Sequence, residues 1–259
     1  MSKKIILLAG PTASGKSNLA IHLAKKLNGE IINADSMQIY KEFSILSSRP
    51  KKSEIKKIKH HLYGIVSVKK YFSAGDWLKE VKKKINECIK KRKTPIVVGG
   101  TGLYFNTITK GISKIPNIDL KTRKKVRDLF KELGSKKFYK KLLELDPKVK
   151  DKISFTDSQR LQRAYEVKLK TKRSLFDWFA KTKSEFVNFN IKKIFIDIPR
   201  DQLLLKISKR TELMFKENCI SEVRQFLKLK INRSLSANKL IGVHEIHQYL
   251  KGVISLNEC

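Results

Sequence analysis

The chain has 259 residues, of which 41% are hydrophobic, and 58 Lys and Arg against 24 Asp and Glu give it a net charge of +34. This composition excludes an intrinsically disordered chain, and the length allows a full core in one or two domains. The charge favours polyanionic partners such as nucleic acid or phosphorylated ligands, although a general bias towards lysine would raise it without any partner. The charge therefore indicates a class of partner and not a function.

The three cysteines, Cys88, Cys219 and Cys259, are too few for a disulfide framework and too widely spaced for a Cys-x-x-Cys site. We therefore expect a reducing compartment and give them no role. The apolar run at residues 5–9 is too short for a signal peptide, and no stretch approaches the roughly 18–20 apolar residues of a membrane span. We expect a cytoplasmic protein with no membrane partner.

Short apolar runs bounded by charges or turn formers predict buried parallel strands, and they lie at residues 5–9, 30–34, 95–98 and 194–198. Helical patterns separate them. Leucines at four-residue spacing predict a helix from Ser17 that stops at Gly29, and an apolar stripe predicts another over 75–91. A last helical segment is expected over 202–229. This alternation predicts an α/β fold with a doubly wound parallel sheet.

The pattern changes between residues 115 and 190, where lysine-rich helical segments replace the strand-like runs. We expect a helical insertion domain over 115–190 and a core domain made of 1–114 and 191–259. Within the insertion, Thr156-Asp157-Ser158-Gln159 matches the Ser/Thr-x-x-Glu/Gln capping box, which predicts a helix start near Asp157. Arg160 and Arg163 would then occupy neighbouring surface positions.

The strongest motif is G-x-x-x-x-G-K-S/T, which lies between an apolar strand and an amphipathic helix. Its backbone N–H groups and the helix N-terminus can cradle phosphate oxygens, Lys16 can neutralise them, and Ser17 can ligate Mg²⁺. The motif predicts a P-loop NTPase-like sheet and a bound di- or triphosphate, without identifying that ligand as ATP. The predicted phosphate-binding residues are Gly10, Pro11, Thr12, Ala13, Ser14, Gly15, Lys16 and Ser17.

Polar residues follow two further predicted strands: Asp35 comes after the run at 31–34, and Thr101 after the run at 96–100. Ligands of a parallel sheet bind beyond the carboxyl ends of its strands, so these side chains can converge on the P-loop. Asp35 would serve there as a general base or a Mg²⁺ ligand, or it would cap the following helix. The glycines Gly99, Gly100 and Gly102 would permit close approach of the backbone.

Asp197 ends a later apolar run and could hold a metal ion. The segment that follows it has the form seen in small nucleotide kinases, which makes a P-loop kinase the rival function. Arg210, two turns into the next helix, could place its guanidinium over departing phosphates or could remain solvated. His60 and His61 could contact phosphate, or could form a loop or a packed pair.

Together these motifs resemble the tRNA dimethylallyltransferase family, whose members are also called tRNA isopentenyltransferases, over nearly the whole chain. The resemblance rests on many ordered segments and is far more specific than a P-loop alone. Besides the P-loop, these segments are Asp35-Ser36-Met37-Gln38-Ile39-Tyr40, His60-His61-Leu62, Tyr71-Phe72-Ser73-Ala74, Val98-Gly99-Gly100-Thr101-Gly102-Leu103-Tyr104, Asp157-Ser158-Gln159-Arg160-Leu161-Gln162-Arg163-Ala164, Arg210 with Met214, and Ile241-Gly242.

The resemblance implies transfer of a dimethylallyl group from dimethylallyl diphosphate to N6 of the adenine at position 37 of tRNA, with release of pyrophosphate. It implies that Asp35 accepts or orients the N6 proton, that Thr101 lies near the reacting groups, and that Lys16, Arg210 and Mg²⁺, with Ser17 as a metal ligand, stabilise the pyrophosphate. The partner would be the anticodon stem-loop, bound by a monomer. The implied tRNA-contacting residues are Asp35, Ser36, Met37, Gln38, Thr101, Arg123, Gln159, Arg160, Leu161, Gln162 and Arg163.

Two features depart from the family pattern. Leu46-Ser47-Ser48-Arg49-Pro50 stands where Gly-Thr-Ala-Lys-Pro is usual, so we expect one substrate-facing loop to differ. Relatives usually continue past Ile241-Gly242 with a basic helix that grips RNA, whereas this sequence ends at Cys259, so we expect a shortened core domain and altered RNA affinity. The alternatives are a P-loop small-molecule or nucleotide kinase, and a truncated RNA-binding remnant without catalysis.

Overall fold

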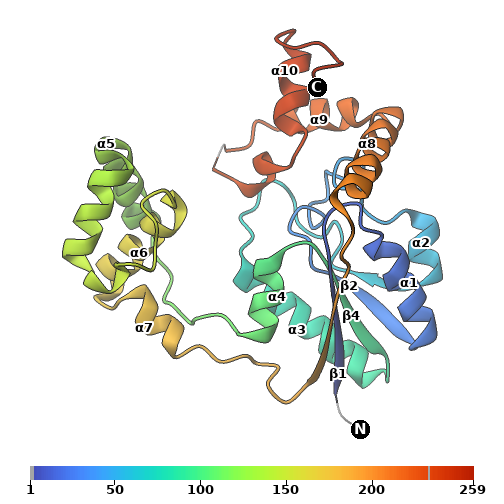
Figure 1. Cartoon of the computed structure of the whole chain (residues 1–259), viewed down its shortest axis with the longest axis horizontal. Helices are drawn as coiled ribbons and strands as arrows, with labels where there is room; N and C mark the ends of the chain where they lie inside the picture. The colour runs from blue at the N-terminus through green and yellow to red at the C-terminus, as the bar shows by residue number, and fades with distance from the viewer. Residues whose placement is uncertain (1–2, 233) are drawn as a thin grey trace. The chain divides into compact units, whose positions relative to one another are not determined.

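The computed structural model describes residues 3–232 and 234–259, which fold into two compact units. The first unit comprises Met1–Ile108 and Asn188–Cys259, and the second comprises Thr109–Val187 (Figure 1). The second unit is therefore inserted within the sequence of the first, and the sequence patterns placed its limits at 115 and 190. Within the described residues, no helix is both long and apolar enough to span a membrane.

A five-stranded, all-parallel sheet forms the centre of the first unit, in the order β3-β2-β4-β1-β5. Ile6 of β1 pairs with Ile96 of β4 on one side and with Lys192 of β5 on the other. Parallel neighbours of this kind require long crossover connections, so the predicted α/β fold class is confirmed. The strands are β1 (Lys4–Ala9), β2 (Gly29–Asn33), β3 (His60–His61), β4 (Thr94–Gly99) and β5 (Asn190–Phe195).

Helices cover both faces of the inner strands, which explains why these strands are continuously apolar. On one face, Ile6 and Leu8 of β1 pack with Ala20 and Ala24 of α1 (Lys16–Lys26). The helix α3 (Ala74–Lys90) packs against β2 and β4, and its buried Trp77 stacks on Tyr104 with ring centroids 4.1 Å apart. Ile191 and Ile194 of the edge strand β5 are half-buried, and the other residues of this strand are exposed.

Shorter elements complete the first unit: α2 (Lys52–Lys57), α4 (Gly102–Thr109), α8 (Arg200–Lys216), α9 (Cys219–Lys228), the 3-10 turn η2 (Ser236–Lys239) and α10 (Val243–Leu250). The helical segment predicted over 202–229 is confirmed, and it consists of two helices, α8 and α9. Asn218 divides them by adopting a left-handed φ of 67°, and its side chain caps α9 by accepting a hydrogen bond from the Ser221 N–H.

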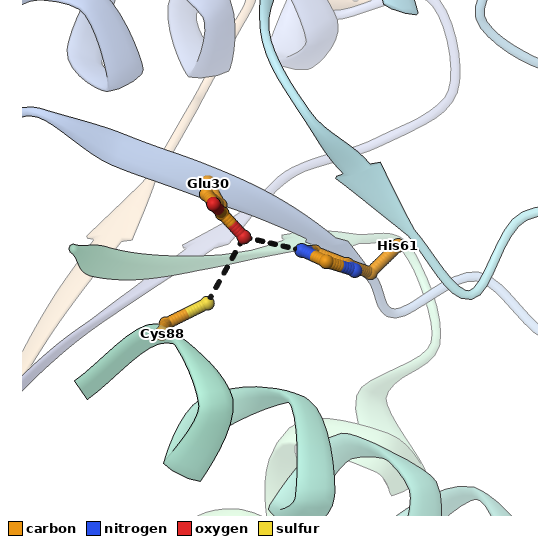
Figure 2. A group of neighbouring side chains, drawn as sticks. All are labelled: Glu30, His61 and Cys88. Atoms are coloured by element: carbon orange, nitrogen blue, oxygen red, sulfur yellow. Dashed lines mark hydrogen bonds and ion pairs between the residues drawn. The ribbon is translucent and has the colours of Figure 1, made fainter. Parts of the chain in front are cut away.

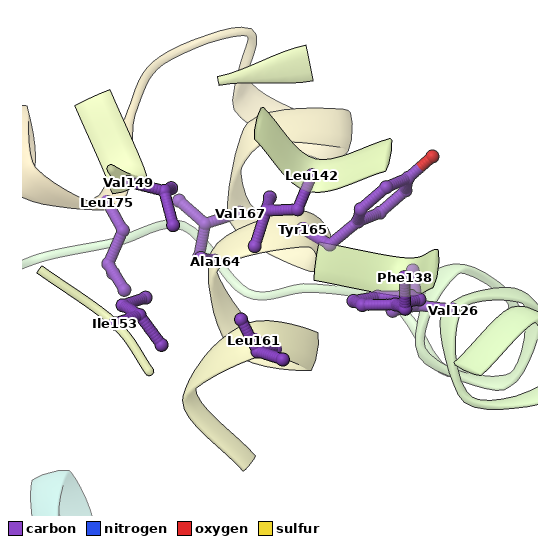
Figure 3. Packing of buried hydrophobic residues seen from close by; sticks show 10 residues of the cluster. All are labelled: Val126, Phe138, Leu142, Val149, Ile153, Leu161, Ala164, Tyr165, Val167 and Leu175. Atoms are coloured by element: carbon purple, nitrogen blue, oxygen red, sulfur yellow. The ribbon is translucent and has the colours of Figure 1, made fainter. Parts of the chain in front are cut away.

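The second unit is helical, with α5 (Leu120–Leu145), the 3-10 turn η1 (Pro147–Val149), α6 (Ser158–Thr171) and α7 (Leu175–Ala180). Gly134, with a φ of 67°, breaks α5 into two helical parts. Phe138 and Leu142 of α5, together with Leu161 and Val167 of α6, belong to one buried apolar cluster (Figure 3). The unit thus has a hydrophobic core of its own.

Some predicted boundaries differ from the structure. The first helix ends at Lys26, and Gly29 belongs to β2 instead of stopping the helix. The helix α6 is capped by Asp157, whose carboxylate accepts from the Arg160 N–H at 3.1 Å, so the capping residue is not Thr156. The last strand begins at Asn190 and ends at Phe195, because its ladder follows β1 from Lys4 to Ala9.

Candidate active site

The carboxyl ends of β2, β4 and β1 are neighbours in the sheet, and each is followed by predicted site residues. Asp35 follows β2, Thr101 follows β4, and the P-loop at 10–17 follows β1. At Gly99 the end of β4 approaches β2 so closely that a Cβ atom would lie 2.1 Å from the Ala34 carbonyl oxygen. Close approach is therefore required at Gly99, whereas nothing lies within 3.4 Å of a Cβ atom at Gly100 or Gly102.

The P-loop turns into α1 at Gly15, which has a φ of 87° and occupies the N-cap position. Lys16 is the first residue of α1, and its Nζ donates a hydrogen bond to the Pro11 carbonyl at 2.5 Å. Burial lowers the pKa of Lys16, the Asp35 carboxylate opposes this shift, and the Arg210 guanidinium adds to it. Lys16, Asp35 and Arg210 therefore share one electrostatic environment, although Arg210 is remote in sequence.

A cavity of about 270 Å³ lies over the P-loop. Two donor atoms in its lining residues, Ser14 Oγ and Arg210 Nε, are buried and meet no hydrogen-bond partner among the residues that the structure describes. Buried unpaired donors are costly, so a ligand with several acceptor oxygens would satisfy them. The lining residues are Thr12, Ala13, Ser14, Gly15, Lys16, Ser17, Asn18, Asp35, Gln38, Ser48, Tyr63, Val98, Gly99 and Arg210.

Asp35 is held in the cavity wall by its neighbours. The Asn33 side chain accepts from the Asp35 N–H at 2.8 Å and donates to the Asp35 carbonyl at 3.0 Å. One carboxylate oxygen of Asp35, Oδ1, accepts from the backbone N–H groups of Met37 at 2.8 Å and Gln38 at 3.4 Å. Asp35 therefore caps the following turn and also lines the cavity, which combines the two alternatives that the sequence left open.

Thr101 does not line the cavity but supports the chain segment that does. Its Oγ1 accepts from the Ser36 N–H at 2.9 Å and lies 3.3 Å from the Ser36 hydroxyl. Gln38 reaches the cavity, and its Nε2 donates to the carbonyls of Ser47 and Ser48 at 2.9 and 3.0 Å. Residues 35–38 are thus fixed from both neighbouring loops.

Tyr63 was missed as a site residue. Burial raises the pKa of its hydroxyl, and the Asp35 carboxylate raises it further, so Tyr63 brings a protonated hydroxyl to the residues that line the cavity. Its only sequence signal was its position after the His60-His61-Leu62 motif. The packed-pair interpretation of the two histidines is nearer to the structure, because they form β3, and His61 lies 2.6 Å from Glu30.

Known proteins share this architecture. The sequence model described as IPP transferase matches residues 38–259. The tRNA dimethylallyltransferase of Pelagibacter ubique is 56% identical over 255 residues, which cover 98% of this chain and 82% of that protein. The tRNA dimethylallyltransferase of Rickettsia felis is 43% identical, over 99% of this chain and 83% of that protein.

The chain belongs to the tRNA dimethylallyltransferase family.

Solved structures agree with this assignment. A eukaryotic dimethylallyltransferase acting on tRNA superposes with a TM-score of 0.82 at 27% identity, over 97% of this chain and 64% of that one. The tRNA isopentenylpyrophosphate transferase of Bacillus halodurans gives a TM-score of 0.67 at 28% identity, over 99% and 80% of the two chains. The rival kinase interpretation relied on Asp197 as a metal ligand near the P-loop. Asp197 is exposed and does not line the cavity, so the structure does not support that role.

The loop that departs from the family pattern is fastened by a residue that sequence reasoning missed. Glu222 of α9 accepts from the backbone N–H groups of Ser44, Ile45 and Leu46 at 2.6 to 2.9 Å, and from the Ser44 hydroxyl at 3.0 Å. No local pattern could have revealed Glu222, because it lies 178 positions from Ser44. Its carboxylate fixes the loop that contacts Gln38.

Two residues that line the cavity have side chains of a kind that could hold a magnesium ion. Ser17 offers a hydroxyl oxygen, and Asp35 supplies the one carboxylate among the lining residues. Mg²⁺ binds through one or two such protein oxygens together with phosphate oxygens and water. The buried donors Ser14 Oγ and Arg210 Nε, which meet no partner within residues 3–232 and 234–259, would suit phosphate oxygens beside such an ion.

The remaining residues implied in tRNA contact lie in the second unit. Gln159 and Arg160 are exposed at the start of α6, Gln162 and Arg163 are half-buried, and Arg123 of α5 is half-buried. Leu161 is different, because its side chain is fully buried in the core of that unit and does not face solvent. Leu161 is therefore corrected to a core residue, which its spacing from Ala164 and Tyr165 also indicates.

Proposed function

We propose that the chain transfers the dimethylallyl group of dimethylallyl diphosphate to N6 of adenine-37 in tRNA and releases pyrophosphate. The observation that carries this proposal is the grouping of P-loop residues, Asp35 and Arg210 around one cavity, with buried donors at Ser14 and Arg210 that meet no partner in the described part of the chain. The curated relatives and a solved eukaryotic relative bear names that state the same activity.

The P-loop side of the cavity binds the leaving group. Lys16, Arg210 and the Ser14 hydroxyl donate to pyrophosphate oxygens, and α1 adds the positive end of its dipole. Negative charge develops on the pyrophosphate as the C–O bond to the prenyl group breaks, so donors fixed beforehand lower the barrier. Ser17 would hold Mg²⁺, which would supply further neutralisation of the pyrophosphate charge.

The opposite wall receives the nucleophile. Asp35 accepts the N6 proton of adenine, or orients the amino group, through the carboxylate oxygen that does not cap the turn. Thr101 acts by holding Ser36, and Gln38 lines the adjoining wall. The target base must leave its stack to reach this wall, which costs a few kcal/mol that contacts to the rest of the RNA offset.

The tRNA partner is an anticodon stem-loop. Gln159, Arg160, Gln162, Arg163 and Arg123 of the second unit would contact it, together with residues 35–38 and Thr101 of the first. The net charge of +34 supports salt-dependent binding to RNA. The enzyme would act as a cytoplasmic monomer.

The decisive assay mixes purified protein, Mg²⁺, labelled dimethylallyl diphosphate and unmodified tRNA, and measures label in RNA. We expect label in the parent reaction and a loss of roughly 10²–10³-fold in single-turnover rate for Asp35→Asn and Arg210→Ala, the range for removal of one transition-state stabiliser. Asp35→Asn keeps an oxygen for the Met37 and Gln38 N–H groups, so it tests the charge. Lys209→Ala is the matched exposed control for Arg210.

Other outcomes identify the alternatives. Salt-sensitive tRNA binding without label would indicate an RNA-binding chain without catalysis. ATP turnover that needs no tRNA, with no label in RNA, would indicate a kinase.

A further inference from the structure

Three metal-ligating side chains meet in the interior of the first unit and take no part in the prenyl-transfer site. Glu30 comes from β2, His61 from β3, and Cys88 from the last turn of α3, and the three side chains point toward one another (Figure 2). Their donor atoms all lie within 4.8 Å of one another, and all three residues are buried. Over residues 3–232 and 234–259, no other group of three such side chains meets this description.

The distances in the cluster are close to those of a coordination sphere. The Cys88 Sγ and Glu30 Oε2 atoms are 3.6 Å apart, and the His61 Nε2 and Glu30 Oε2 atoms are 2.6 Å apart. Zn²⁺ bonds of about 2.0–2.3 Å place neighbouring tetrahedral ligands roughly 3.3–3.6 Å apart. The sulfur–oxygen distance already fits, whereas the nitrogen–oxygen distance must widen by roughly 0.7–1 Å.

His61 is the ligand that is best placed to make this shift. It lies on a two-residue strand at the edge of the sheet, whereas Glu30 lies on an inner strand. His61 also lines a cavity of about 540 Å³, together with His60, Tyr63 and Lys84. Glu30 and Cys88 do not line this cavity, so His61 is the member of the cluster that faces it.

The charges of the cluster also suit a divalent ion. A thiolate, a carboxylate and a neutral imidazole balance a charge of +2, which gives a neutral centre in a buried place. Without an ion, the Cys88 thiol donates its proton to Glu30. Binding forms the sulfur–metal bond and releases this one proton to solvent.

We propose that Glu30, His61 and Cys88 bind one Zn²⁺ ion that joins β2, β3 and α3. A set containing a thiolate and an imidazole selects Zn²⁺ over Mg²⁺, which prefers oxygen ligands. The site is separate from the cavity over the P-loop, whose lining contains none of these three residues. The proposal therefore stands independently of the prenyl-transfer reaction.

The test uses Co²⁺ as a spectroscopic substitute for Zn²⁺ on the full chain after chelation. We expect one equivalent of Co²⁺ to produce a thiolate-to-cobalt charge-transfer band and visible d–d bands, which Zn²⁺ removes and excess Mg²⁺ does not. Zn²⁺ should also raise the melting temperature of the protein, because the ion binds the native state. Removal of the ion with a chelator should lower the melting temperature again.

Variants assign the site. Cys88→Ser should lose the charge-transfer band, and His61→Gln should weaken Co²⁺ binding by roughly tenfold or more. The matched control, Cys219→Ala with Cys259→Ala, leaves Cys88 as the one cysteine and should keep the band. The proposal is overturned if the folded parent gives no thiolate band, if the band survives in Cys88→Ser, or if the control variant loses it.

Discussion

Asn33 holds Asp35 from two sides, accepting from its N–H at 2.8 Å and donating to its carbonyl at 3.0 Å. The Asn33 amide also donates to the Leu62 carbonyl at 3.1 Å, and the Asn33 carbonyl accepts from Trp77 Nε1 at 2.9 Å. Asn33 is completely buried, so no water competes for these bonds. One side chain thus joins the end of β2 to the segment that carries Tyr63.

Replacing Asn33 should therefore impair a site that it does not enter. We expect Asn33→Ala to leave Asp35 N–H and the Leu62 carbonyl unpaired, at a cost of about 1–3 kcal/mol for each buried group, and to lower kcat more than it raises KM. Denaturant unfolding and steady-state kinetics measure the two effects. Asn33→Asp restores only the acceptor, so recovery of full activity by Asp would contradict this role.

Glu222 should matter for the loop at 44–46 in the same indirect way. Glu222→Gln replaces one acceptor oxygen with a donor that faces backbone N–H groups, so we expect a loss of about 1–3 kcal/mol in the free energy of unfolding and a lower kcat/KM. Glu217→Gln is the control, because Glu217 pairs with Lys51 at the exposed surface, where such pairs contribute about 0–1 kcal/mol. Equal effects of the two substitutions would refute the special role of Glu222.

Gly99 and Gly100 provide a matched pair within one motif. Gly99→Ala would place a methyl group against the Ala34 backbone, so the strand ends must separate, which we expect to cost about 1–3 kcal/mol and to displace Asp35. Gly100→Ala meets no atom closer than 3.9 Å and should be tolerated. Thermal unfolding and single-turnover rates of the two variants test this, and similar losses in both would show that the close approach at Gly99 is not limiting.

The lowered pKa of Lys16 predicts how pyrophosphate binding depends on pH. Only the ammonium form neutralises phosphate, so affinity should fall as the pH rises through the pKa of Lys16, at a pH below the ordinary lysine value of 10.5. Calorimetric titrations with pyrophosphate across alkaline pH measure this decline. The guanidinium of Lys16→Arg stays charged over that range, so the pyrophosphate affinity of this variant should change little with pH. An identical decline in affinity in this variant would assign the effect to another group.

The grouping of Asp35 with the P-loop could be predicted from the sequence, because parallel strands bring their carboxyl ends to one edge of a sheet, whereas Thr101 ends up supporting Ser36 outside the cavity lining. The sequence could suggest a phosphate-binding role for Arg210 but could not predict its position, since nothing local in α8 shows that this side chain faces the P-loop. Glu222 and Tyr63 were missed because their roles depend on contacts between segments far apart in the sequence. Leu161 shows the opposite case, in which helical periodicity was the better guide than family resemblance.

The position of β5 beside β1 has a consequence for synthesis of the chain. At 5–20 residues per second, about 10 to 40 s pass between emergence of the first and the last strand from the ribosome. During that time the apolar strand β1 can pair with β4 but presents its other backbone edge without a partner, a known hazard for aggregation. The second unit is one continuous segment and can fold before β5 has been synthesised. Nascent chains arrested just before Asn190 therefore carry a folded second unit but an incomplete sheet, and we expect them to depend most on chaperones.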